Sequence, residues 1–223
     1  YNWAKENMVM EKDAAAYCCR YPEAGRAFLG LRLSKKNRLQ WLETALSASK
    51  QMNDSKSEQV QLVNLGDFFL EFGSPQQALE LYKQAYEFAR HLAARADEMH
   101  LLDSIGLCFA KLNNHMKATD YFQQALDKKT GNASMERNVL VNMGKSFSAL
   151  GNHRKSIGFY EQALAIDRQT GNRPAEGESL WLICQALAQN RNMVEAIDRA
   201  QEAIALLAEL KRPEAAKAKK QLE

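Results

Sequence analysis

The sequence of 223 residues contains little glycine, proline or cysteine. Its 11 glycines and 4 prolines are few for a β-rich or low-complexity chain. The 4 cysteines form no Cys-x-x-Cys pair, and the adjacent Cys18 and Cys19 have a poor geometry for an intrachain disulfide. We therefore expect reduced, buried thiols, which are typical of a cytoplasmic protein.

Long apolar runs are also missing from the sequence. No segment approaches the roughly 18 to 20 apolar residues that a bilayer-spanning helix needs, and no leader with a charged and an apolar region opens the chain. Hydrophobic residues make up 46% and charged residues 26%, which is typical of a globular chain. We expect a soluble protein without a membrane partner. Because the sequence begins at Tyr1 rather than Met, we expect it to be part of a longer protein.

Charge of one sign does not dominate any large part of the chain. The net charge of +3 is accounted for by residues 211–223, which hold five basic and two acidic side chains. A nucleic-acid groove usually needs a clustered basic face, because affinity comes largely from neutralised phosphates. We therefore expect no nucleic-acid partner.

Small residues recur along the chain in three parallel series. All three series share the same successive spacings, each of about 40 residues, which indicates a repeated structural unit. The series are Gly66, Gly106, Gly144 and Cys184; Ala78, Ala118, Ser156 and Ala196; and Ala85, Ala125, Ala163 and Ala203.

Each repeat has the pattern of two antiparallel helices. Leu62, Leu65, Phe69 and Phe72 follow the i, i+3, i+4, i+7 spacing that predicts the buried stripe of a first helix. The turn Gly73-Ser74-Pro75 predicts the start of the second helix, because Pro is favoured at a helix start.

Small residues also predict how the two helices pack and end. We expect Gly66 and Ala78 to let the two helix backbones approach closely. The identical tripeptides Thr130-Gly131-Asn132 and Thr170-Gly171-Asn172 predict the ends of two second helices, because Gly readily adopts the left-handed conformation that closes a helix.

These residues resemble the tetratricopeptide repeat (TPR) family over roughly residues 55–210. The family pattern of Leu-Gly, aromatic, Ala, aromatic and Ala is matched by Leu65-Gly66, Phe69, Ala78, Tyr82 and Ala85, and again by Met143-Gly144, Phe147, Tyr160 and Ala163. The period here is longer than that of the usual repeat, and the chain resembles the lengthened variants of some polarity and scaffold adaptors, in which the second helix is extended. The resemblance implies an all-α, right-handed superhelical solenoid of antiparallel helix pairs. Ser156 and Arg191 depart from the pattern.

The repeats predict three segments. Residues 1–54 are expected to hold degenerate N-terminal helices and a first helix pair, because Ala45 lies one repeat spacing before Ala85. Residues 55–212 are expected to hold four TPR-like repeats. Residues 213–223 are expected to form a capping helix, since a terminal repeat cannot bury its outer face alone. A basic amphipathic segment for a membrane or a calmodulin-type partner is the alternative for this tail.

Catalytic and cofactor motifs are not found. The sequence has no GxxxxGK[ST] or GxGxxG motif for phosphates, and its histidines form no HExxH or similar zinc pattern. His115 and His153 are expected to be solvated turn residues before second helices. Cys108 lies two residues after Gly106, where a small core residue is a simpler interpretation than a nucleophile. We expect no cofactor, no metal and no enzymatic activity.

The resemblance implies a concave groove whose wall is built from the first helices, and ligands are expected to bind there as extended peptides or helices. We call these positions the predicted ligand face; relative to Gly66 they lie at −6, −3, −2, +1 and +5. Asn is informative there because its amide can pair with both groups of an extended peptide backbone. Trp181 is either a binding hot spot or a packed end residue. The candidate ligand-binding residues are Asn64, Asp67, His100, Asp103, Asn138, Asn142, Lys145, Trp181 and Gln185.

The ligand class follows in part from what this face lacks. TPR domains that capture chaperone tails hold the terminal carboxylate with Asn and two basic residues, and here Val60, Val63, His100 and Asp103 stand at the neighbouring positions. The sequence therefore predicts a mixed-charge or partly apolar protein or peptide ligand instead.

The flanks resemble the C-terminal sensor arms of bacterial STAND-type signalling proteins. The order that carries the resemblance is Asn2-Trp3, Trp41 to Leu46, the repeats, Ser179-Leu180-Trp181 and Pro213 to Lys217. The resemblance implies a nucleotide-binding or effector domain before Tyr1 in a longer parent chain. Three functions stay open: a protein-binding sensor or scaffold module, which we favour, a structural array that binds only its own kind, and an enzyme that uses Cys108 or a histidine.

Overall fold

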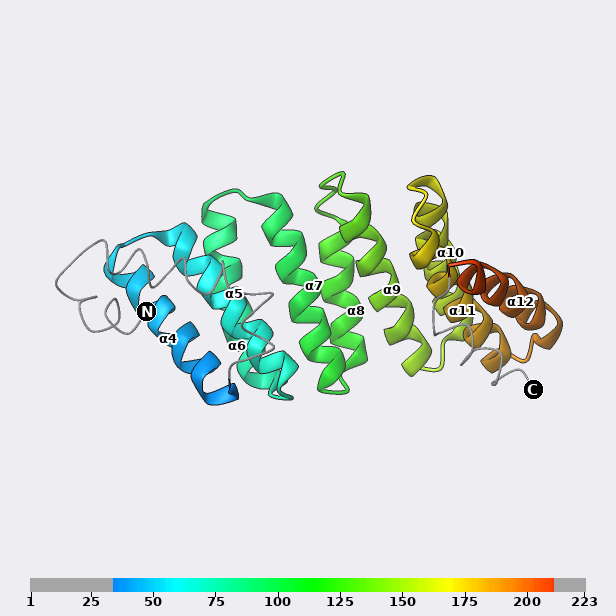
Figure 1. The fold of residues 1–223 in the computed structure, drawn as a ribbon, viewed down its shortest axis with the longest axis horizontal. Helices are drawn as coiled ribbons and strands as arrows, with labels where there is room; N and C mark the ends of the chain where they lie inside the picture. Colours follow the sequence, from blue (N-terminus) through cyan, green and yellow to red (C-terminus); the bar gives the residue numbers. More distant parts are fainter. Residues whose placement is uncertain (1–33, 211–223) are drawn as a thin grey trace. The chain divides into compact units, whose positions relative to one another are not determined.

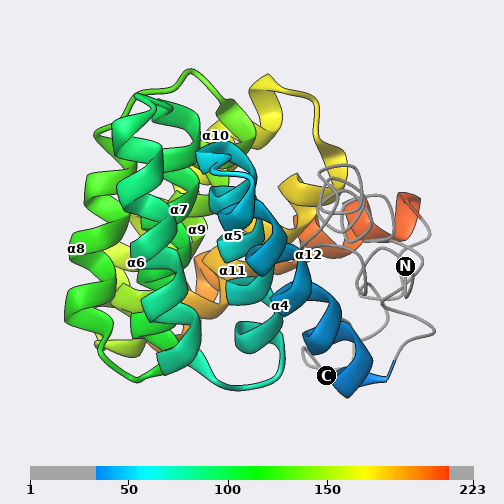
Figure 2. The same ribbon diagram turned by 90° about the vertical axis from the view of Figure 1, so that its left-hand side faces the viewer.

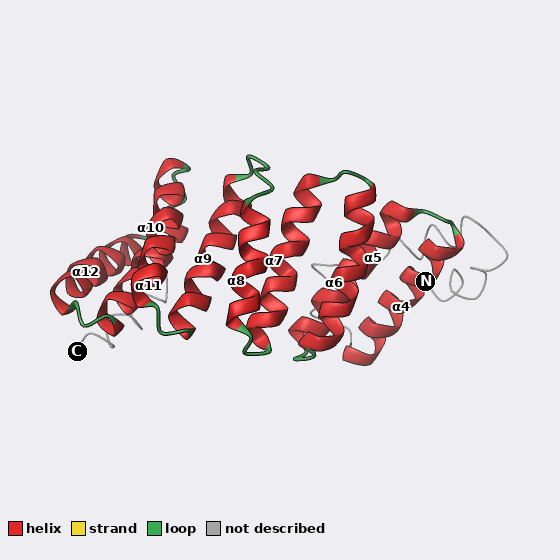
Figure 3. Ribbon diagram, turned by 180° about the vertical axis from the view of Figure 1, so that it is seen from behind, coloured by secondary structure: helices red, strands yellow, loops and turns green. Residues whose placement is uncertain are grey.

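The computed structural model describes residues 34–210, and this part of the chain consists of helices and turns without a strand (Figure 3). The predicted all-α class is therefore confirmed. The helix expected before residue 34 and the capping helix at 213–223 lie outside the described residues. The helices are α4 (Lys35–Gln51), α5 (Ser55–Glu71), α6 (Pro75–His91), α7 (Arg95–Lys111), α8 (His115–Leu126), α9 (Ala133–Ala149), α10 (His153–Gln169), α11 (Arg173–Gln189) and α12 (Met193–Glu209).

The chain divides into two compact units, one ending at Cys108 and the other beginning at Phe109, so that the boundary falls within α7. In the first unit α4 packs against α5, and α5 packs against α6. In the second unit each helix from α8 to α11 packs against the next one along the chain. Figures 1 and 2 show these consecutive helices side by side within each unit.

Most helices are seventeen residues long, and α8 is the exception with twelve. It ends at Leu126, ahead of the tripeptide Thr130-Gly131-Asn132 that was expected to end it. This expectation was wrong for α8, because the chain already enters the left-handed region at Lys129, with a φ of 46°. It is confirmed for α10, which ends at Gln169 with Thr170 as its C-cap and Gly171 at a φ of 65°. The Asn132 side chain accepts a hydrogen bond from the Met135 N–H and caps the start of α9. The equivalent Asn172 caps α11 in the same way, by accepting from Ala175.

The turns between first and second helices share one backbone conformation. Gly73, Asn113, Gly151 and Arg191, which stand at equivalent positions of successive repeats, have φ values of 77°, 57°, 75° and 62°. Pro75 begins α6 directly after the first of these turns, as predicted. The left-handed region costs a residue with a side chain more than it costs glycine, so Arg191 is the strained member of the series.

The glycines of α5 and α9 make room for an aromatic ring rather than for the backbone of the next helix. A Cβ at Gly66 would lie 2.6 Å from Cε1 of Tyr82, and one at Gly144 would lie 2.5 Å from Cε1 of Tyr160. The expectation that Gly66 and Ala78 bring two backbones together therefore named the wrong contact. The tyrosine ring of the second helix explains why the residue that faces it in the first helix is glycine.

The core of the first unit also differs from the expected stripe on α5. Leu62 and Leu65 are buried, but the ring that is fully buried is Phe68, whereas Phe69 and Phe72 are only partly covered. Helix α4 explains the difference, because Leu42 on α4 is buried in one cluster with Leu65 and Phe68. The buried face of α5 is therefore wider than the single line of positions that the i, i+3, i+4 pattern predicts.

No helix within residues 34–210 combines the length and the apolar character that crossing a bilayer requires.

Candidate functional site

The nine candidate residues all lie on first helices, in two sets. Asn64 and Asp67 on α5 and His100 and Asp103 on α7 belong to the first unit. The second unit holds the five others, which are Asn138, Asn142 and Lys145 on α9 and Trp181 and Gln185 on α11. Each unit is therefore described as a site of its own.

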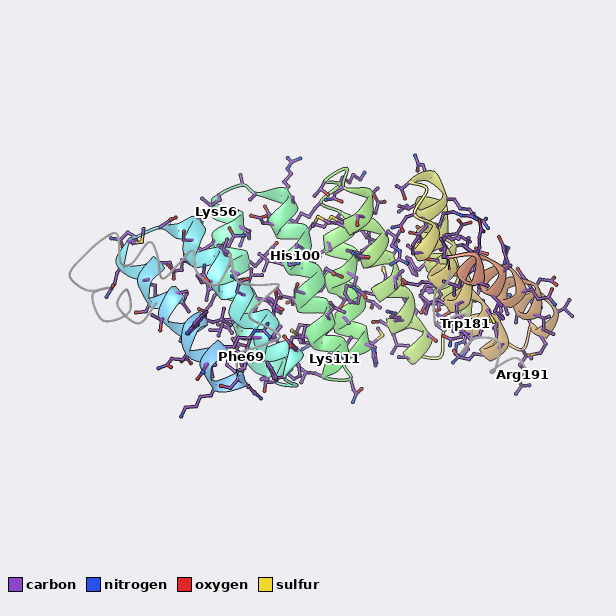
Figure 4. The ribbon with its side chains drawn as sticks, in the orientation of Figure 1. Lys56, Phe69, His100, Lys111, Trp181 and Arg191 are labelled. Carbon is purple, nitrogen blue, oxygen red and sulfur yellow. The ribbon has the colours of Figure 1, made fainter. Side chains whose placement is uncertain are left out.

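In the first unit a cavity of about 160 Å³ lies between α5 and the first turns of α7. Two of the candidate residues, Asn64 and His100, line it, whereas Asp67 and Asp103 do not. Lys56 and His100, labelled in Figure 4, bring a side chain from each of the two helices. The lining residues are Lys56, Gln59, Val60, Val63, Asn64, Asp97, His100 and Leu101.

The charged group of this cavity is the Asp97 carboxylate. Its Oδ2 accepts hydrogen bonds from Lys56 Nζ at 2.5 Å and from Gln59 Nε2 at 3.1 Å. Partial burial acts to raise the pKa of Asp97, but the two hydrogen bonds and the positive charge of Lys56 outweigh it and lower that pKa below its ordinary value. Asp97 is therefore ionised at neutral pH and joins the first turn of α5 to that of α7.

Asp67 and Asn64 make contacts inside the first unit. Asp67 Oδ1 accepts a hydrogen bond of 2.7 Å from the hydroxyl of Tyr82, the ring that packs at Gly66. Asn64 Nδ2 lies 3.4 Å from Gln61 Oε1, and Gln61 is buried. Asp67 thus positions a core tyrosine, while Asn64 is half-buried and borders the cavity.

The second unit has a larger cavity of about 370 Å³ among α9, α10 and α11. Asn138 is the one candidate residue among its lining, and Asn142, Lys145, Trp181 and Gln185 lie outside it. The lining residues are Ser134, Arg137, Asn138, Ile166, Asp167, Thr170, Asn172 and Ala175.

A partly buried ion pair forms one wall of this second cavity. Arg137 Nε lies 3.1 Å from Asp167 Oδ1, and the side chains are 13% and 2% exposed. Ser179 donates to the same carboxylate at 2.7 Å, and Arg137 Nη2 donates to the Ala175 carbonyl at 3.2 Å. Helices α9, α10 and α11 are therefore joined by one hydrogen-bonded group whose charges are paired.

The other candidate residues of the second unit differ in exposure. Lys145 and Gln185 are exposed, and Asn142 is half-buried. Trp181 is also half-buried and packs against the core cluster that contains Leu180 and Ile183 (Figure 4). Of the two interpretations of Trp181, this packing favours the residue that stabilises the end of the array.

Sequence reasoning missed Gln59, Asp97, Arg137 and Asp167. The available signal was an offset of about one repeat between polar partners: Gln59 contacts Asp97 38 residues later, and Ser148 donates to Gln189 41 residues later. Such pairs join neighbouring first helices, and the predicted ligand face began one residue after Gln59 and Arg137 and three residues after Asp97. Asp167 is on a second helix and carried no comparable signal.

The cysteines and histidines that were weighed as catalytic groups are placed as follows. Cys108 is buried, and burial raises the pKa of its thiol to about 12; burial also raises the pKa of Cys184. His115 and His153 are the first residues of α8 and α10 and are half-buried, so they are not the solvated turn residues that were expected. Within residues 34–210, no group of three or more His, Cys, Asp or Glu side chains is placed to hold a metal ion.

Comparison with protein families matches the tetratricopeptide repeat over residues 58–130 and 136–209. The chain therefore belongs to the tetratricopeptide repeat family. Members of this family are generally non-catalytic interaction scaffolds. Sequence comparison with curated proteins finds no match.

Several solved structures have a similar fold. Aspartyl phosphate phosphatase F from Bacillus subtilis is 15% identical, with a TM-score of 0.77, over 96% of this chain and 55% of that one. A Rap protein complexed with competence and sporulation factor is 13% identical, with a TM-score of 0.69, over 90% of this chain and 55% of that one. A signal-transduction ATPase with numerous domains (STAND) and a tetratricopeptide repeat sensor, from Pyrococcus horikoshii, is 16% identical, with a TM-score of 0.73, over 90% of this chain and 32% of that one. The chain thus spans about half of the first two proteins and about a third of the third.

Proposed function

We propose that this chain binds an extended peptide or a protein segment on the faces of α5, α7, α9 and α11. That it is a protein-interaction module follows from its family. The observation that supports this location of the binding site is the cavity between α5 and α7. Asn64 and His100 were assigned to the predicted ligand face from repeat spacing, and both line this cavity. The Rap protein of similar fold is found with a bound factor, which supports the same kind of use here.

A non-catalytic role is part of this proposal. A thiol acts as a nucleophile in its ionised form, and burial with a raised pKa disfavours that form for Cys108 and Cys184. We expect the chain alone to bind no nucleotide, duplex nucleic acid or membrane, and to need no cofactor.

The experiment is selection of peptides from a random displayed library on the full chain. Affinities of the selected peptides are then compared between the wild type and the Asn64→Ala, Asn142→Ala and Trp181→Ala variants. Each Asn variant should weaken a peptide that contacts it by about 1 to 2 kcal/mol, because the peptide is left with an unpaired group. Trp181→Ala should cost about 2 kcal/mol or more if Trp181 is a hot spot, and little if it only packs the core. Equal affinity in all variants, with folding intact, would place binding elsewhere.

Self-association is a second candidate, favoured by the start of α12. Met193, Val194 and Ile197 there are 57%, 76% and 44% exposed, which is unusual for apolar side chains so close together. Sedimentation of the full chain tests it: a dimer or larger array that Val194→Lys dissolves would support this candidate, and a monomer over the same concentration range would oppose it.

The parent protein is proposed to be a bacterial, cytoplasmic signalling protein in which this chain is the sensor arm. The STAND protein with a tetratricopeptide repeat sensor supports the sensor-arm part of this context by its similar fold. Sequencing the gene upstream of Tyr1 tests it. A phosphate-binding loop there would support the sensor arm, and its absence would remove the nucleotide-binding domain from the proposal.

A further inference from the structure

We propose that the cavity between α5 and α7 binds a positively charged side chain of the ligand, Arg or Lys, with Asp97 and Gln59 as the accepting groups. The inference rests on the proposed function, because it names the part of a peptide that the first unit recognises. Three observations support it: the buried acceptor oxygen of Gln59, the comparison of Gln59 with the equivalent Arg137 in the second unit, and the Asp97 carboxylate with the apolar walls of the cavity.

The buried acceptor is Gln59 Oε1. Gln59 is 3% exposed, and the hydrogen bond from its Nε2 to Asp97 fixes which end of the amide faces the carboxylate. Its Oε1 is buried and accepts no hydrogen bond from any residue between 34 and 210. A buried acceptor without a donor is unfavourable. Gln59 also lines the cavity, so the proposal places the ligand N–H that would satisfy this oxygen on the cavity side.

The second unit already holds a cation at the equivalent position. Arg137 stands two repeats after Gln59, and Ala175 stands two repeats after Asp97 at the same combined spacing. The Arg137 guanidinium donates to the Ala175 carbonyl and pairs with Asp167. In the first unit the side chain is the shorter Gln59, and the carboxylate is supplied by Asp97. The first unit therefore has an acidic side chain, Asp97, where the second has Ala175, and it lacks a guanidinium at the position of Gln59.

Asp97, the acidic residue of a lining that also holds Lys56 and His100, and the apolar walls of the cavity are the features that a basic side chain would contact. Asp97 receives its hydrogen bonds at Oδ2, and its Oδ1 accepts none within the described part of the chain. Lys56, the present ion-pair partner, is 58% exposed and can turn toward solvent without losing hydration. Val60, Val63 and Leu101 provide an apolar wall for the methylene stem of Lys or Arg. An acidic ligand group would meet Asp97 and would leave Gln59 Oε1 without a donor.

The experiment uses peptides selected from the random library on the full wild-type chain. We expect them to share a Lys or Arg at one position, and we expect norleucine at that position, which keeps the stem and removes the charge, to raise Kd about 10-fold or more. On the Asp97→Asn variant the same replacement should change Kd less than about 2-fold, because the acceptor charge is gone. Asn at position 97 keeps an oxygen for Gln59 Nε2, so the variant tests the charge rather than the fold.

Two further variants sharpen the result. Gln59→Leu removes the buried acceptor at similar volume and should raise Kd for the basic peptide while leaving the norleucine peptide nearly unchanged. Glu87→Gln is the matched control: it removes a negative charge from the exposed pair with Arg90 on α6, and it should leave both peptides unchanged.

Failure of this inference is distinguishable from failure of the proposed function. If the selected peptides share no basic residue, or if norleucine weakens binding equally on the wild type and on Asp97→Asn, the cation pocket is overturned. Dependence of the same peptides on Asn64 would still support the proposed function. If the library gives no peptide that binds the wild type, both proposals fail together.

Discussion

At the scale of single residues, Gly144 is kept small by the ring of Tyr160. A Cβ at this position would lie 2.5 Å from Cε1 of the ring, so Gly144→Ala should lower the free energy of unfolding by about 1 to 3 kcal/mol. Gly158, in the interior of α10, is the matched control because a Cβ there meets nothing within 4 Å. Gly158→Ala should stabilise the chain by about 0.5 to 1 kcal/mol, since Ala is the better helix former. Urea denaturation measures both, and equal effects would mean that Tyr160 does not limit position 144.

Arg191 occupies a left-handed turn position that glycine holds at Gly73 and Gly151. Its φ of 62° costs an L-residue with a side chain more than glycine, while glycine loses more conformational entropy on folding. We expect the first effect to win, so that Arg191→Gly raises the free energy of unfolding by about 0.5 to 1 kcal/mol. Arg191→Lys keeps a long side chain and the positive charge, and it should leave the free energy of unfolding unchanged. An Arg191→Gly variant less stable than the wild type would contradict the account.

At the scale of the helices, α5 begins at a charged cap. Asp54 Oδ1 accepts hydrogen bonds of 3.1 Å from the N–H groups of Lys56 and Ser57, and the Ser57 hydroxyl donates to Oδ2 at 2.6 Å. The hydrogen bonds from Ser57 are the largest cause that lowers the pKa of Asp54 below its ordinary value of 3.8. Because the folded-state pKa is the lower one, the stabilisation is present above pH 3.8 and is lost as pH falls through the folded pKa.

The variant that isolates this charge is Asp54→Asn, which can still cap the helix. Its unfolding free energy should fall short of the wild-type value at pH 7, and the difference should shrink as pH drops below 3.8. Chemical denaturation across this pH range measures it. A difference that is the same at pH 7 and at pH 2 would mean that the carboxylate does not act through its charge.

Helices α9 and α10 are joined by the Arg137–Asp167 pair, whose carboxylate is only 2% exposed. Asp167→Ala leaves the partly buried guanidinium with the exposed carboxylate of Glu178, 3.5 Å from Nη2, as its remaining ion-pair partner, and should cost about 3 kcal/mol of unfolding free energy. The double variant Arg137→Met with Asp167→Leu removes both charges and should cost less than the single one. Arg90→Met, at the exposed pair with Glu87, serves as the control and should cost less than about 1 kcal/mol. A double variant as unstable as Asp167→Ala would show that packing, and not the unpaired charge, sets the cost.

Repeat spacing could predict the helices but not all of their contacts. It placed Gly66, Gly144 and the turns between first and second helices correctly, because a period records which positions are equivalent. It could not show that a tyrosine ring fills the space at Gly66, nor that Gln59 and Arg137 reach the neighbouring repeat. Those contacts depend on how each helix is rotated against its neighbours. Where equivalent positions carry different side chains, as Gln59 and Arg137 do, the repeat spacing gives no sign of the contact that each of them makes.

At the scale of the whole chain, one repeat position carries different chemistry in the two units. Gln59 and Arg137 are equivalent, yet the first borders a cavity with an unpaired acceptor and the second is satisfied by Asp167 and Ala175. The fold alone therefore does not decide what each unit recognises, since ligand recognition depends on the side chains placed on a common scaffold. Of the nine residues predicted from spacing, Asn64, His100 and Asn138 border a cavity. The roles of the others stay predictions.

The central claim is that ligands bind on the first helices, and it is tested most directly by NMR titration of the isotope-labelled full chain with a library-selected peptide. We expect the largest amide shift changes in α5, α7, α9 or α11, at residues that include Asn64 or Asn142, and small changes in α6, α8 and α10. Shift changes concentrated in the second helices, or in α12 alone, would contradict the claim.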